Sequence, residues 1–151
     1  MQNYTQMEGY EVYVLKCENE KYYVGKTKNS LKRITNHFRG KTTAWTSLHR
    51  PLSVIEIIEG CDAFDEDKYT KKYMALYGID NVRGGSYVKI KLEEPAKAFL
   101  RHEFITAQDR CYGCGESGHF NRNCTKRPAT FWQRLYAFFH PAPAPPPTVQ
   151  P

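Results

Sequence analysis

Three cysteines and one histidine near the carboxyl end of the chain have the spacing of metal ligands. Cys111, Cys114, His119 and Cys124 follow the pattern C-x2-C-x4-H-x4-C, with glycines after the second cysteine and before the histidine. Thiolates and an imidazole in such a set bind Zn²⁺ tetrahedrally. So short a segment has no apolar core, and the metal would supply most of its folding free energy. We therefore predict a structural zinc site in residues 110–125.

A second set of side chains, suited to phosphate chemistry, is spread over the first half of the chain. Tyr13 and Tyr23 lie in two segments that alternate apolar and polar residues. Paired positions on adjacent strands would bring their phenols to one end of a sheet, although such a pair can also be simple packing. Arg33 and His37 are four residues apart, so on a helix they form a cationic edge able to hold phosphate oxygens, or an ordinary solvated face.

The elements that must position these groups can be read from hydrophobic spacing. Residues 11–15 and 22–27 predict a β-hairpin around a polar turn. A helix over 31–39, capped by Asn29 or Ser30, would pack Leu31, Ile34 and Phe38 on the sheet. Residues 41–51 predict a loop or short helix. Residues 52–58 are apolar enough to predict a central strand.

A second helix would present a carboxylate to the protein body. Asp62 is the expected N-cap, with Asp65 in the capping-box position, and the helix should end at Gly78. Glu66 lies nearer the centre of the inward stripe than Asp65 does, so its carboxylate needs a cation or a metal as partner. After a turn with two glycines, residues 88–92 predict an edge strand. The inward stripe consists of Tyr69, Tyr73, Leu76 and Tyr77.

In order and spacing, these residues resemble the GIY-YIG endonuclease domain over residues 9–92. The resemblance implies an α+β fold with a small mixed three-stranded sheet flanked by helices. It also implies hydrolysis of phosphodiester bonds with one divalent metal, Mg²⁺ or Mn²⁺. The matching positions are Tyr13 in Val-Tyr-Val, Tyr23 and Gly25 in Tyr-Val-Gly, Arg33, His37, Glu66 and Asn81.

The resemblance also implies a role for each of these residues. Glu66 would hold the metal, Arg33 would neutralise the scissile phosphate, and Tyr13 would act as the general base or position the attacking water. Tyr23 and His37 would complete the pocket, and Gly25 and Asn81 would be structural. The chain departs from the family pattern at Glu11, where the family has glycine, and at Val12, where it has isoleucine.

The cysteine-rich segment resembles the CCHC zinc knuckle of nucleocapsid and RNA-processing proteins. In that family aromatic residues stack on unpaired bases, which assigns this task to Tyr112 and Phe120. Arg122, Lys126 and Arg127 would hold the phosphate backbone. The alternative is a knuckle that binds protein. Cys17 and Cys61 lie outside the cluster and are expected to be buried thiols.

Composition and the remaining segments complete the predicted organisation. The 151 residues carry a net charge of +6, compatible with a polyanionic partner. No apolar run approaches the roughly twenty residues of a membrane span, and the amino terminus lacks signal-peptide features, so we expect an intracellular protein. A connecting helix is predicted over 93–109. The tail, 126–151, is aromatic and then proline-rich, so we expect it to be partly disordered and a possible surface for a protein partner.

These patterns together predict a metal-dependent endonuclease with a zinc knuckle that aids nucleic-acid binding. Because a knuckle reads unpaired bases, structured or partly single-stranded DNA is the expected substrate, and RNA is left open. The alternative is a non-catalytic protein that binds single-stranded nucleic acid and keeps a nuclease-like scaffold. The inward carboxylate of Glu66 favours the enzyme, because a scaffold has no use for it.

Overall fold

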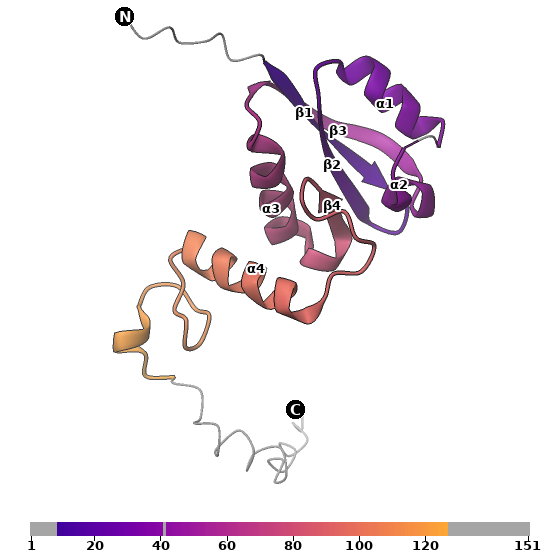
Figure 1. The fold of residues 1–151 in the computed structure, drawn as a ribbon. Helices are drawn as coiled ribbons and strands as arrows, with labels where there is room; N and C mark the ends of the chain where they lie inside the picture. The colour runs from indigo at the N-terminus through magenta and orange to yellow at the C-terminus, as the bar shows by residue number, and fades with distance from the viewer. Residues whose placement is uncertain (1–8, 41, 127–151) are drawn as a thin grey trace, which may run out of the picture. The chain divides into compact units, whose positions relative to one another are not determined.

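The computed structural model describes residues 9–40 and 42–126, which fall into two compact units divided between Arg101 and His102. The first unit is a sheet with helices on both faces (Figure 1). The second contains the end of helix α4 (Glu94–Ala107) and the cysteine-rich loop. From residue 127 onward the predicted tail lies outside the described residues. No helix within the described ranges is long and apolar enough to cross a membrane.

The sheet has four strands in the order β3-β1-β2-β4, where three were predicted. Strand β1 (Tyr10–Cys17) is antiparallel to β2 (Lys21–Thr27) and to β3 (Pro51–Cys61). Strand β4 (Val82–Gly84) is parallel to β2, so the sheet is mixed, as predicted. The predicted hairpin of β1 and β2 is confirmed.

Strand β3 is an edge strand, and the prediction that it is central was wrong. Its eleven residues run opposite the eight of β1 with three shifts of register. A bulge puts an extra residue into one strand and bends it. Consecutive side chains such as Val54 and Ile55 are both exposed as a result. The apolar residues of this segment therefore belong to a curved edge strand, and they do not indicate burial on two faces.

The predicted strand over residues 88–92 does not form, because a buried arginine occupies its carbonyl groups. The guanidinium of Arg83 is 1% exposed and lies over the ring of Trp45, 4.7 Å from its centroid. Residues 88–92 therefore loop around Arg83, and the fourth strand forms earlier, at β4. At distances of 2.6–2.9 Å, Arg83 donates to the backbone oxygens of Ile79, Val82, Lys89 and Ile90.

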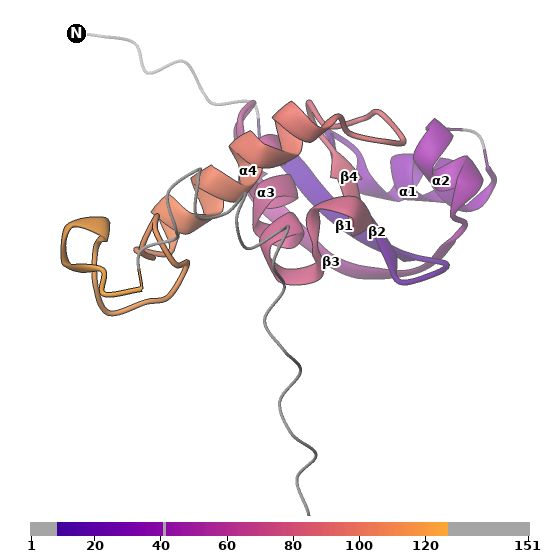
Figure 2. The same cartoon turned by 90° about the horizontal axis from the view of Figure 1, so that it is seen from below.

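The two faces of the sheet are covered by different helices (Figures 1 and 2). Alternate side chains of a strand point to opposite faces. Tyr13, Leu15 and Tyr23 form one core with Trp45 of α2 (Ala44–Leu48), and Ile34 of α1 (Ser30–Phe38) packs against it. On the opposite face, Tyr22 stacks on Tyr77 of α3 (Asp65–Tyr77), with ring centroids 4.1 Å apart.

Helix α1 begins as predicted but presents a different face to the sheet. The side chain of Asn29 caps it by accepting a hydrogen bond from the Lys32 N–H at 3.0 Å. Leu31 and Phe38, predicted to pack inward, are 80% and 48% exposed. The buried residue is His37, which contacts Tyr13. The helix is therefore rotated so that Ile34 and His37 face the sheet, while Leu31 and Phe38 do not.

Helix α3 also differs from its prediction in its buried face. Asp62 and Asp65 exchange hydrogen bonds with each other's backbone N–H groups, as a capping box would, and the helix ends before Gly78. The predicted inward residues Leu76 and Tyr77 are exposed. The buried stripe consists of Thr70, Tyr73 and Met74.

Candidate active site and metal centre

The two tyrosines share one face of the sheet but are not direct partners. Tyr13 pairs with Gly25, and Tyr23 pairs with Leu15. The phenols are therefore diagonal neighbours, with ring centroids 6.3 Å apart. The prediction of a directly paired couple was wrong: Tyr23 lies two residues from the position opposite Tyr13, and that position is occupied by Gly25.

Gly25 makes room for the Tyr13 hydroxyl. A Cβ atom at this position would overlap the hydroxyl and ring of Tyr13. Since every other residue type carries that atom, glycine is needed here for close approach. This is a direct physical reason for a glycine in the second motif.

His37 links Tyr13 to a pair of threonines. Its Nε2 lies 2.8 Å from the Tyr13 hydroxyl oxygen, and its Nδ1 lies 2.7 Å and 3.1 Å from the hydroxyl oxygens of Thr42 and Thr46. Burial, and then the nearby charge of Arg33, lowers the pKa of His37 to about 4. The imidazole is therefore neutral at pH 7, and the predicted cationic edge with Arg33 does not include it.

Arg33 is the cation that contacts both phenols. Hydrogen bonding to Tyr13 is the main cause that raises the pKa of Arg33, and interactions with Tyr23 add to it. Burial raises the pKa of Tyr13 and of Tyr23, while Arg33 acts on both in the opposite direction. The guanidinium thus remains charged beside two protonated phenols.

Glu66 lies on the first turn of α3 and acts on the same two tyrosines. After burial, its negative charge is a further cause that raises the pKa of Tyr23 and, more weakly, of Tyr13. Its Oε2 lies 4.0 Å from Nζ of Lys26, and the described residues place no hydrogen-bond donor on its carboxylate. The oxygen atoms are therefore available to a metal ion, which fits the predicted role.

Lys26 is a candidate site residue that the sequence analysis missed. Its ammonium donates to the carbonyl of Ala63 at 2.7 Å and lies 4.9 Å from the ring centroid of Tyr10. It is thereby held beside Glu66. The available signal was its position directly after Gly25, which places it at the same end of β2.

Glu11, the residue that departs from the family pattern, stabilises the start of α1. Its Oε2 accepts a hydrogen bond from the Ser30 N–H at 2.8 Å. A carboxylate at a helix amino terminus satisfies a free donor and complements the helix dipole. The substitution for glycine therefore has a structural consequence on the helix that carries Arg33.

Asn81 joins two elements of the scaffold. Its Nδ2 donates to the carbonyl of Tyr77 at the end of α3, and its Oδ1 accepts from Lys21 at the start of β2, both at 2.7 Å. It belongs to a short 3₁₀ helix, Ile79–Asn81. These contacts suit the structural role expected for it.

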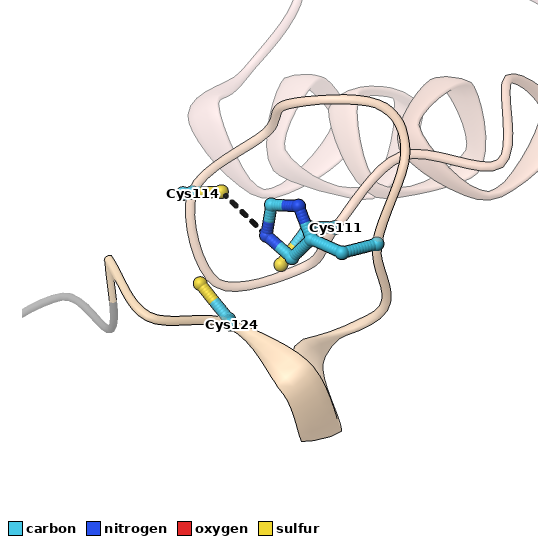
Figure 3. Close-up of side chains that lie close together, drawn as sticks. Cys111, Cys114 and Cys124 are labelled. Atoms are coloured by element: carbon cyan, nitrogen blue, oxygen red, sulfur yellow. Dashed lines mark hydrogen bonds between the residues drawn. The ribbon is translucent and has the colours of Figure 1, made fainter.

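The three cysteines and the histidine converge as a possible metal site (Figure 3). The ligand atoms of Cys111, Cys114, His119 and Cys124 all lie within 4.8 Å of one another, and Cys114 Sγ is 3.3 Å from His119 Nε2. Burial opposes ionisation of Cys111, but backbone N–H groups of Cys114 and Gly113 lower its pKa to about 7. Thiolates directed to one point fit a tetrahedral metal such as zinc.

The side chains of this loop that were predicted to contact nucleic acid differ in their exposure and in the partners they already have. Phe120 is 63% exposed. Tyr112 is covered on one side, because its ring stacks on His102 with centroids 4.8 Å apart and its hydroxyl lies 2.8 Å from that of Thr106. Lys126 pairs with Glu116 at 2.7 Å, and Arg122 is exposed. Arg127 lies outside the described residues.

The two remaining cysteines are buried in the first unit, as predicted. Cys17 is fully buried, and burial raises its pKa to about 12. Cys61 is 4% exposed, and burial raises its pKa as well. Neither thiol belongs to the Cys3His cluster.

Comparison with known proteins gives a match for part of the chain. No curated protein and no solved structure gives a significant match. The match to a family model covers the strands and helices that carry Tyr13, Tyr23, Arg33, His37 and Glu66, and does not extend to the Cys3His loop. Residues 9–78 match the GIY-YIG catalytic domain, a family whose members are generally endonucleases.

Proposed function

We propose that this protein is a metal-dependent endonuclease that hydrolyses phosphodiester bonds. The observation that supports it most is a convergence of groups from separate elements. Tyr13 and Tyr23 of the hairpin meet Arg33 and His37 of α1, and the Glu66 carboxylate of α3 acts on both phenols. A hydrolase for phosphodiesters needs such a set: a cation for the phosphate, a carboxylate for a metal, and a group that orients water.

Some residues of the chain would bind the charged phosphate, and others would position the attacking water and its proton. Arg33 would bind the scissile phosphate through its planar fork. Tyr13 is protonated at neutral pH, because burial raises its pKa. Its hydroxyl would orient the attacking water, and neutral His37, 2.8 Å away, would hold that hydroxyl in place through a hydrogen bond. Tyr23 would close the other side of the pocket.

Glu66 would hold the divalent ion, Mg²⁺ or Mn²⁺. Such an ion would supply positive charge and lower the pKa of bound water. A single carboxylate leaves most coordination positions to water and phosphate, as Mg²⁺ prefers. The Lys26 ammonium, 4.0 Å from Glu66, would hold this carboxylate in position in the absence of the ion.

The Cys3His loop would hold Zn²⁺ and bind unpaired nucleotides. Phe120 offers an exposed ring for stacking, and Arg122 and Lys126 offer cations for the backbone. The expected substrate is therefore branched, flapped or otherwise partly single-stranded DNA, with RNA as the second candidate. The tail would serve as a surface for a protein partner.

A cleavage assay with a matched pair of variants tests the proposal. Purified full-length protein is incubated with labelled single-stranded, branched and duplex DNA and with RNA, in buffer free of divalent ions and after addition of Mg²⁺. EDTA is avoided because it would also remove zinc. We expect Mg²⁺-dependent cutting, lowered at least about 100-fold by Glu66→Gln without loss of substrate binding.

The control is Glu59→Gln, which removes the same charge from an exposed position on β3. It should cut at the wild-type rate. Equal cutting by the Glu66 variant would overturn the proposal. If the wild-type protein binds single strands but cuts none of the substrates, the protein is a binding protein on a nuclease-like scaffold.

A further inference from the structure

A hollow of about 410 Å³ lies at the carboxyl end of α1, on the other side of His37 from Tyr13. It is formed by the last residues of α1, the first residues of β3 and the helix α2 between them. Ligand pockets are typically about 300–1,000 Å³, so one nucleotide could enter it. The residues around it are His37, Phe38, Arg39, Gly40, Thr46, Ser47, Arg50 and Pro51.

The charge of the hollow is positive. Arg39 and Arg50 line it, and no acidic residue does. Within the described residues, neither guanidinium has a hydrogen-bond or ion-pair partner. The carboxylate of Glu18 accepts a hydrogen bond from the backbone N–H of Arg50 at 3.3 Å, and not from its guanidinium. Two unpaired arginines at one hollow are suited to a phosphoryl group, which each can bind through two parallel donors.

One effect opposes an anion at this place. The carboxyl end of a helix carries a partial negative charge, which repels an anion. Arg39 is the C-cap residue of α1 and offsets this charge. Arg50, which directly precedes β3, adds a second cation, so the two guanidinium groups together leave positive charge for the ligand.

The hollow also offers an aromatic ring and a polar wall. Phe38 is 48% exposed, although its type would favour burial. A base stacked on such a ring stabilises binding without regard to sequence. Ser47 is exposed and can donate to a sugar or phosphate oxygen.

We propose that this hollow is a second nucleotide-binding site. In it Arg39 and Arg50 bind a phosphoryl group and Phe38 stacks on an unpaired base. The choice of ligand rests on the proposed nuclease function, because a substrate strand would supply both groups. The site would hold a nucleotide away from the scissile phosphate, with the His37 ring as part of the wall between the two positions.

Binding is tested on the full chain with Glu66→Gln, so that the strand is not cut. Affinity for a fluorescent oligothymidylate is measured by anisotropy at several salt concentrations. We expect Arg39→Ala together with Arg50→Ala to weaken binding about tenfold and to lower the slope of log K against log salt by about 1.4. The control, Arg101→Ala, removes one exposed arginine that pairs with Glu94 and should change neither quantity.

Phe38→Ala separates stacking from charge. It should weaken binding about tenfold with no change of the salt slope, because a stacked ring displaces no counterions. The proposal is overturned if the double arginine variant binds as the Arg101 variant does, or if Phe38→Ala has no effect.

Amide spectra distinguish the source of the nucleotide. Shifts of the Thr46 and Ser47 signals with thymidine monophosphate alone would make a free nucleotide sufficient. Shifts with the oligonucleotide only would assign the site to the substrate strand. No shift with either would overturn the proposal. These readouts need no cutting, so a protein that fails every cleavage assay could still bind here, and a working nuclease could lack this site.

Discussion

The two units of this protein obtain their order from different sources. In the first unit, strands β1 and β2 supply a core of fully buried apolar side chains, among them Leu15 and Val24. In the described part of the second unit, the two buried residues are Cys111 and Cys124. Both belong to the Cys3His cluster. In the second unit, metal-binding side chains therefore take the place that buried apolar side chains have in the first.

This difference determines how closely fold and function depend on one another. The candidate active site lies on a scaffold that other residues hold together, so Glu66 or Arg33 could change without unfolding the first unit. In the second unit the groups that would bind the metal are the same groups that would hold the loop. Removal of one should remove both the metal and the structure.

The largest expected effect follows from substitution of a cluster ligand. Cys114→Ser should abolish stoichiometric zinc binding and unfold residues 111–124, since metal contributes about 10–16 kcal/mol to folding in comparable small zinc modules. The transition of the first unit should stay within about 1 °C of the wild type. Metal content and amide spectra of both units measure these outcomes.

The control for this substitution is Cys61→Ser, a buried thiol of the first unit. It should leave the zinc content unchanged. If Cys114→Ser retains one zinc per chain, or if it melts the first unit as well, the contrast between the units is wrong.

A substitution at Gly25 tests whether scaffold and site are separable at every position of the first unit. Gly25→Ala should lower cleavage at least about 100-fold, because the new methyl group takes the space of the Tyr13 hydroxyl. The unfolding free energy should fall by about 1–3 kcal/mol from overpacking. Gly9→Ala is the matched control, since nothing lies within 4 Å of its new atom. Wild-type cutting by Gly25→Ala would exclude the proposed role of Tyr13.

Local patterns were sufficient to predict the elements that carry both sites. The hairpin, the Asn29 cap and the metal-ligand spacing depend on neighbours in sequence, and each appears in the structure. The faces of the helices could not be predicted in the same way. Hydrophobicity placed Leu31 and Phe38 inward, whereas the buried contact of His37 with Tyr13 joins residues 24 apart.

The fourth strand illustrates why tertiary contacts override local preference. Residues 88–92 alternate as an edge strand does, and nothing within that segment argues against pairing. The buried Arg83 guanidinium binds the carbonyls of Lys89 and Ile90, and this removes the acceptors that a strand would use. A buried cation with four backbone acceptors cannot be seen in hydrophobic spacing.

The pH dependence of stability tests the first unit separately from the second. His37 has a pKa of about 4 in the folded protein and about 6.5 when unfolded. The unfolded chain therefore binds more protons between these values. Stability present above pH 6.5 should be lost as pH falls toward 4, by an amount on the order of 3 kcal/mol.

Denaturation followed by Trp45 fluorescence, in a Trp132→Phe background, reports on the first unit alone. His37→Gln should flatten the dependence between pH 6.5 and 4, and the exposed His102→Gln should not. An unchanged slope in the His37 variant would mean that carboxylates or the metal ligands, and not this buried imidazole, cause the acid sensitivity.

The smallest effect is expected at Glu11, where the scaffold supports the site indirectly. Glu11→Ala removes the acceptor for the Ser30 N–H and should destabilise the first unit by about 1 kcal/mol. Glu11→Gln keeps an acceptor but not the charge, so it should cost roughly half as much. Thermal unfolding measures both, with Glu59→Ala as the exposed control. Because Arg33 is in the first turns of the same helix, cleavage should fall only severalfold with Glu11→Ala. A loss as large as that of Gly25→Ala would instead place Glu11 in the chemistry, and the separation of scaffold from site in this unit would be wrong.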